Sequence, residues 1–153
     1  MLRMKQLLNV LIAKSILETV LVGVLTVVVY MNAFPPFFHG WGEAVTETRQ
    51  ISGWAVSDAD PWGRVQVQLF IDGRLVGTQA ANFSRPDVVA AGWAKDEWHG
   101  YSFVPGELAA GPHEAKVYAL HQSGAGSRYT LQLLGSPIEF EVSDDGSWKL
   151  NKR

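Results

Sequence analysis

The stretch Ile16–Phe34 reads Ile-Leu-Glu-Thr-Val-Leu-Val-Gly-Val-Leu-Thr-Val-Val-Val-Tyr-Met-Asn-Ala-Phe and decides how the chain is organised. At about 1.5 Å per residue, a helix of this length spans roughly 28 Å, close to the hydrocarbon thickness of a bilayer. Its only charge is Glu18, and Pro35 and Pro36 follow it. A residue before proline is pushed out of the α region, so the helix ends there. The pattern predicts one transmembrane helix over residues 15–34.

Basic residues indicate the orientation of this helix. Arg3, Lys5 and Lys14 precede it, whereas Arg49 alone is basic in the twenty residues after Met31. Cytoplasmic flanks carry the excess of Lys and Arg, so we expect a cytoplasmic N-terminus in a bacterial inner membrane and a periplasmic C-terminal domain. A cleaved signal peptide is the alternative, but the apolar run is longer than a usual signal core.

One face of the helix carries small residues at helical spacing, which allow another helix to approach closely. We therefore expect it to pack against other membrane-protein subunits, with room for lipid or pigment contact along the helix. In the alternative interpretation, the two charged residues beside the small ones pair with each other and this face meets lipid. The predicted packing residues are Ser15, Thr19, Gly23 and Thr26, with Lys14 and Glu18 beside them.

Aromatic residues crowd the end of the helix, as in the belts found at membrane–water interfaces. The predicted interface residues are Tyr30, Phe34, Phe37, Phe38 and Trp41. Residues 1–14 are expected to form a cytoplasmic or interfacial segment. Residues 35–44 are expected to form a linker too short for a flexible tether, which keeps the following domain near the membrane surface.

From residue 45 onward the pattern becomes strand-like. Residues 64–72 alternate between apolar and polar side chains, and Asp72-Gly73 then predicts a tight hairpin turn. Seven or eight short strands separated by turn residues predict an antiparallel β-sandwich over residues 45–143, followed by a polar tail over 144–153. We expect Trp54 and Phe140 to be buried between its sheets.

Six short motifs in this domain resemble a bacterial immunoglobulin-like module of secreted and cell-surface proteins. They are Ser52-Gly-Trp-Ala55, Val67 to Gly73 with Leu75-Val-Gly77, Arg85-Pro-Asp-Val88, His99-Gly-Tyr101, Val117-Tyr-Ala119 and Leu134-Gly-Ser-Pro137. The resemblance covers residues 51–142 and implies an Ig-like sandwich. It implies no activity, because such modules serve as spacers or interaction surfaces.

Composition and spacing exclude several functions. The chain has no cysteine, which rules out disulfides and thiolate metal sites. From Pro35 onward it has ten basic and fourteen acidic residues, which argues against nucleic acid. His113 and His121 lie roughly 26 Å apart if they share a strand, too far to hold one metal. We find no nucleophile–base pair or phosphate loop, and so expect neither an enzyme nor a cofactor.

Four residues are candidates for contacts with a partner. Exposed tryptophans stack on sugars or mark protein interfaces, and three of them fall in turns or around a charged loop. Two interpretations remain open for Arg85 and Asp87, a recognition pair or, preferably, a local structural pair. The candidate partner-binding residues are Trp62, Trp93, Trp98 and His39.

These observations lead to two functional hypotheses. The first is a non-catalytic accessory subunit of a larger bacterial membrane complex, of the respiratory or photosynthetic reaction centre–antenna type. In it the helix packs in the membrane and the Ig-like domain braces the periplasmic face. The alternative is a membrane-anchored module that binds carbohydrate or another surface.

Overall fold

The computed structural model describes residues 2–33, 37–123 and 128–150. The chain forms two compact units, residues 1–35 and 36–153, which are described separately. The described part of the first unit is a single helix, α1 (Leu2–Ala33), which runs without a break through the described residues of the expected segments 1–14 and 15–34. Within α1, Gln6–Tyr30 is long and apolar enough to cross a membrane.

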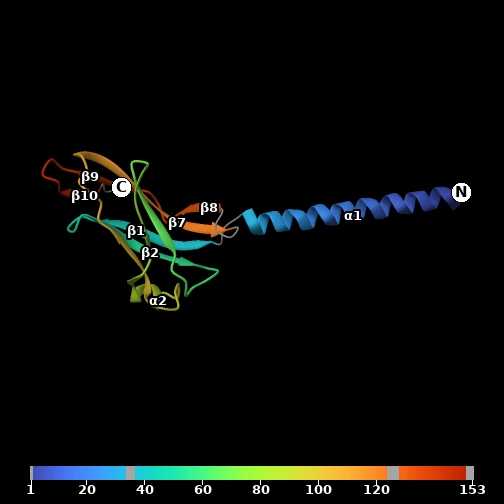
Figure 1. Ribbon diagram of the computed structural model, residues 1–153, viewed down its shortest axis with the longest axis horizontal. Helices are drawn as coiled ribbons and strands as arrows, with labels where there is room; N and C mark the ends of the chain where they lie inside the picture. The colour runs from blue at the N-terminus through green and yellow to red at the C-terminus, as the bar shows by residue number, and fades with distance from the viewer. Residues whose placement is uncertain (1, 34–36, 124–127, 151–153) are drawn as a thin grey trace. The chain divides into compact units, whose positions relative to one another are not determined.

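The second unit consists of two antiparallel sheets and one short helix, α2 (Pro86–Ala90), which Figure 1 traces. The first sheet has the order β1 (Phe38–Val45), β2 (Gln50–Ser57), β6 (Trp98–Phe103) and β5 (Phe83–Ser84). The second has the order β10 (Trp148–Leu150), β9 (Ile138–Val142), β7 (Gly111–Ser123), β3 (Gln66–Ile71) and β4 (Arg74–Ala80), with β8 (Arg128–Leu133) also paired to β7.

One core lies between the two sheets and draws on both. Ile51 and Tyr101 contribute from the first sheet, and Leu69, Val117 and Phe140 from the second. The alternation expected over residues 64–72 is confirmed, because Val67, Leu69 and Ile71 are all buried. The prediction of an antiparallel two-sheet domain after an apolar helix is therefore correct.

The hairpin predicted at Asp72-Gly73 is also confirmed. Both residues have positive φ, 51° and 77°, and they join β3 to β4. Two successive residues with positive φ match the twist of the flanking strands, and aspartate and glycine tolerate this conformation best.

Trp54 does not lie between the sheets, and that expectation is wrong. The inward positions of β2 are Ile51, Gly53 and Ala55, so Trp54 points to the outer face. There it is partly buried and packs against a second apolar cluster formed by Val56, Val88 and Ala94. Phe140, in contrast, is fully buried as expected.

The segments expected to be a linker and a tail contribute strands. Within residues 35–44, the part from Phe38 onward belongs to β1, which pairs with β2 along its whole length. Phe38 is buried in the core rather than exposed as an interfacial aromatic. Within residues 144–153, β10 pairs with β9, and Trp148 is buried against Phe140. In both segments one aromatic side chain fills the core.

Candidate functional site

The outer face of the first sheet is unusually rich in aromatic residues. On β1 and β2 the inward positions are small or apolar, so the large rings of Trp41 and Trp54 face outward. These two tryptophans are directly opposite each other in the strand register, and His39 is likewise opposite Val56. Side chains directly opposite on one face of an antiparallel pair are close neighbours.

These rings continue into a row. The ring centroids of Trp54 and Trp93 are 6.1 Å apart, those of Trp93 and His39 4.5 Å, and those of His39 and Phe37 4.8 Å. Phe37, Trp41 and Trp93 are 59%, 46% and 47% exposed. We refer to these four rings, together with Trp41 as the register partner of Trp54, as the aromatic row (Phe37, His39, Trp41, Trp54 and Trp93).

Polar groups flank the aromatic row. His39 Nε2 lies 2.8 Å from a carboxylate oxygen of Asp58. The side chain of Arg85 packs over Gly100, which lies opposite Trp54 in the strand register. The Arg85 guanidinium also donates two hydrogen bonds to Asp87, of 2.8 and 2.7 Å. This pairing within the chain supports the structural interpretation of Arg85 and Asp87.

Arg85 and Asp87 shift each other's pKa. The hydrogen bonds to Asp87 raise the pKa of the Arg85 guanidinium; partial burial opposes this, and the negative charges of Asp87 and Glu43 add to it. The hydrogen bonds from Arg85 lower the pKa of Asp87 in turn. Both groups are therefore charged at neutral pH.

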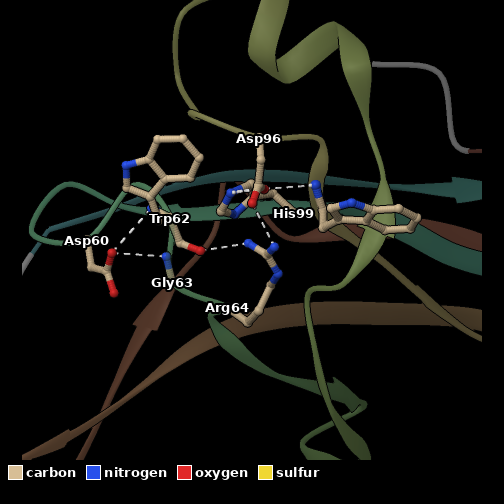
Figure 2. Close-up of polar contacts among 7 residues, drawn as sticks. Asp60, Trp62, Gly63, Arg64, Asp96 and His99 are labelled. Carbon is tan, nitrogen blue, oxygen red and sulfur yellow. Dashed lines mark hydrogen bonds and ion pairs between the residues drawn. The ribbon is translucent and has the colours of Figure 1, made fainter.

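A second cluster forms around Asp96. Figure 2 shows the Arg64 guanidinium between this carboxylate and the carbonyl oxygen of Trp62, with donor–acceptor distances of 2.8 and 2.7 Å. The hydrogen bond from Arg64 is the main reason that the pKa of Asp96 lies below its ordinary value. The backbone N–H of Trp98 also donates to Asp96, at 3.1 Å.

His99 is the fully buried member of this second cluster. Its Nε2 lies 3.2 Å from Asp96, within ion-pair distance, yet neither ring nitrogen makes a hydrogen bond of acceptable geometry with the described residues. His99 shares the inward face of β6 with Tyr101 and Phe103. The cluster joins the loop before β3 to the loop before β6, also through a 3.4 Å bond from Lys95 N to the Pro61 carbonyl. We interpret it as structural.

The structure thus divides the predicted partner-binding residues between two places. His39 and Trp93 meet in the aromatic row, whereas Trp62 and Trp98 border the Asp96 cluster. Among the predicted interface residues, Phe37 and Trp41 belong to the aromatic row, Phe38 is in the core and Tyr30 is on α1; Phe34 lies outside the described residues. Five further residues contribute to these two places although no sequence pattern predicted it: Trp54, Asp58, Arg64, Asp96 and His99.

The predicted packing residues lie on α1. The hydroxyl groups of Thr19 and Thr26 donate to the carbonyl oxygens of Ser15 and Val22, at 2.9 and 2.8 Å. Apart from its chain neighbours and the backbone of its own helical turns, Gly23 has no described atom within 4 Å of where a Cβ would stand. Lys14 and Glu18 form an ion pair of 3.6 Å. The alternative interpretation, in which this face of the helix meets lipid, includes this pairing.

A cavity of about 520 Å³ lies away from the aromatic row, and it brings Arg49 near Glu107, Asp144 and Asp145. Its lining combines one cation with several carboxylates. Within residues 2–33, 37–123 and 128–150, no three histidine, cysteine, aspartate or glutamate side chains gather as metal ligands would.

His113 and Asp72 form an ion pair at the β3–β4 hairpin. The two ring nitrogens of His113 lie 2.6 Å from the Asp72 carboxylate and 2.7 Å from the carbonyl oxygen of Ala109. The Ala109 carbonyl raises the pKa of His113; burial opposes this, and Asp72 adds to it. Burial acts to raise the pKa of Asp72, but the N–H of Glu114 and the His113 ring lower it overall.

This pair predicts a pH-dependent stability. Because the pKa of His113 is raised in the folded state, protonated His113 stabilises the fold at pH values below the ordinary pKa of 6.5. This contribution is lost as the pH rises through the raised pKa. Because the pKa of Asp72 is lowered in the folded state, its carboxylate stabilises the fold at pH values above the ordinary pKa of 3.8. This contribution is lost as the pH falls below that value. The pair therefore stabilises most between these two values. We expect the free energy of unfolding of residues 36–153 to fall between pH 6 and pH 8, measured by urea denaturation.

His113→Gln should flatten this dependence, because glutamine does not titrate. His121→Gln leaves the pair intact and should retain the decline. An equal decline in wild type and His113→Gln would show that another group is responsible.

No family model, curated protein or solved structure matches this chain. Its class is therefore defined by its own architecture. It combines two antiparallel sheets with an N-terminal helix that is long and apolar enough to anchor in a membrane.

Proposed function

We propose that this protein is a non-catalytic accessory subunit of a larger bacterial membrane complex. In this proposal α1 spans the inner membrane with its N-terminus in the cytoplasm, and the β domain lies in the periplasm. The basic residues Arg3, Lys5 and Lys14 before the apolar stretch support this orientation.

The observation that carries the proposal is the surface of α1 around Gly23. Thr19 and Thr26 turn their hydroxyl groups back onto carbonyl oxygens of their own helix. Their polar groups are therefore satisfied without a partner, and the surface between them is shallow because Gly23 has no side chain. Such a surface lets a second helix approach closely, and close packing supplies much of the association energy in lipid.

The β domain would brace the extracytoplasmic side of the complex. We take it to be Ig-like, on the basis of the six motifs between residues 51 and 142. A respiratory assembly or a photosynthetic reaction centre–antenna complex is the kind of host we propose, because both contain many transmembrane helices against which α1 could pack.

Gly23→Leu tests this proposal. A leucine at this position would hold a neighbouring helix away, so the variant should reach the membrane but lose most of its co-purifying subunits in mild detergent. Insertion should be unaffected, since leucine is at least as favourable as glycine in a membrane helix. The measurement is the ratio of partner subunits to this protein after affinity purification.

Val28→Leu is the matched control, because it adds a methylene at another angular position of α1. It should co-purify at the wild-type ratio. If Gly23→Leu also retains that ratio, the small-residue face meets lipid and α1 serves as an anchor alone.

A further inference from the structure

The aromatic row has the form of an open platform. Trp41 and Trp54 are held by the sheet as register partners on β1 and β2, and Trp54 also packs against α2. Trp93 lies in the connection between α2 and β6. Trp93 is tilted by 32° to Trp54 and by 42° to His39, and Phe37 meets His39 edge-on at 73°. Trp93 and His39 cover part of each other, with centroids 4.5 Å apart, so a ligand would meet the exposed parts of Trp93 and Trp41, which are 47% and 46% exposed.

The chemistry of these rings restricts the ligand. The face of an aromatic ring is electrically negative, so it attracts C–H groups that carry slight positive charge. A sugar ring presents such C–H groups on its faces and hydroxyl groups around its edge. Stacking on Trp93 or Trp41 would cover the apolar faces and leave the hydroxyl groups free to bond with the side chains beside the row.

The polar groups beside the row suit a hydroxylated ligand without negative charge, because the carboxylates of Glu43, Asp58 and Asp87 lie beside the single guanidinium of Arg85. Asp58 and Glu43 offer carboxylate acceptors, and Arg85 offers donors. His39 is paired with Asp58, and Arg85 with Asp87. A strongly charged ligand would have to disrupt these pairs, whereas hydroxyl groups can donate to or accept from them as they stand.

We propose that the aromatic row binds a neutral glycan chain. Its sugar rings stack along Trp41, Trp54 and Trp93, and its hydroxyl groups bond to Asp58 and Glu43 at the edges of the row. This site goes beyond the proposed role of α1 in assembly and would give the β domain a ligand of its own. The row is an extended surface rather than a closed pocket, so a chain of several sugars should bind better than a disaccharide.

The test is calorimetric titration of the full chain in lipid nanodiscs, which avoids detergents with sugar headgroups. The probes are the neutral hexasaccharides cellohexaose, chitohexaose and maltohexaose, with their disaccharides for comparison. We expect at least one hexasaccharide to bind, and to bind more tightly than its disaccharide. Trp93→Ala should weaken that binding about tenfold, as loss of a central aromatic contact does in other interfaces.

Three variants make the result specific. Trp62→Ala removes an exposed tryptophan outside the row and should bind as wild type does. Trp93→Phe retains a ring and should lose less affinity than Trp93→Ala, which guards against a simple folding defect. Gly23→Leu should bind the glycan normally, so failure of the assembly proposal would not affect this one.

Several outcomes would overturn the proposal. One is that wild type binds none of the three hexasaccharides at millimolar concentration. Another is that Trp62→Ala weakens binding as much as Trp93→Ala. A third is that Trp93→Ala reduces co-purification of membrane subunits while no glycan binds, which would make the row a protein interface.

Discussion

Phe140→Ala should lower the free energy of unfolding of residues 36–153 by about 3–5 kcal/mol, the usual cost of removing a large aromatic side chain from a core. Phe140 is fully buried. Its ring stacks on Trp148 with centroids 4.5 Å apart and lies 5.6 Å from the ring of His113. Alanine would thus leave a cavity where β7, β9 and β10 meet. Urea denaturation of this unit measures the change.

Val104→Ala is the control for this substitution. Val104 is 70% exposed, so its truncation should change stability by no more than about 0.5 kcal/mol. Phe140→Leu should fall between the two, because it removes less volume. A change below about 1 kcal/mol for Phe140→Ala would mean that the ring is not packed in the core.

The strands that could be predicted from sequence are those with regular alternation. Val67, Leu69 and Ile71 on β3, and Ala115, Val117 and Ala119 on β7, repeat every second residue and are buried. Because each of these positions is apolar and its neighbours are mostly polar, the inward face is evident without knowledge of the partner strand.

The inward faces of β1 and β2 could not be predicted from alternation of apolar and polar residues. Their inward positions include Gly42, Ala44, Gly53 and Ala55, which are small because Tyr101 fills the space above the glycines. The largest apolar residue of β2, Trp54, is therefore on the outer face. Hydrophobicity alone placed it in the core, and only the ring from β6 explains why it is not there.

Only part of the aromatic row could be predicted from the sequence, because the row forms by packing between distant segments. His39 and Trp93 were candidates as single residues, but they are far apart in sequence and meet through packing of the 93–97 loop against β1 and β2. The Asp96 cluster also depends on two loops that converge in the fold, one with Arg64 and the other with Asp96. No local spacing in the sequence signals either arrangement.

Tyr101 and two glycines determine how closely the first sheet packs. Gly42 and Gly53 are register partners on β1 and β2, and a Cβ added to either would lie 2.5 Å from the Tyr101 hydroxyl oxygen. That hydroxyl donates to the carbonyl oxygen of Trp41 at 3.1 Å. Burial raises the pKa of the Tyr101 phenol well above its ordinary value, so the phenol is protonated and remains a donor at neutral pH.

Gly53→Ala should therefore lower the free energy of unfolding by about 3 kcal/mol, the upper part of the usual range for overpacked cores. The added methyl group would meet both the Tyr101 ring and the backbone carbonyl of Trp41, and backbone cannot rotate away as a flexible side chain can. Gly106→Ala is the matched control, because among the described residues no atom beyond its chain neighbours lies within 4 Å of its Cβ position, and it should be neutral or slightly stabilising. Denaturation of residues 36–153 in urea measures both variants. If Gly53→Ala proves as stable as Gly106→Ala, Tyr101 does not occupy the space above the paired glycines. The small inward residues of β1 and β2 would then need another explanation.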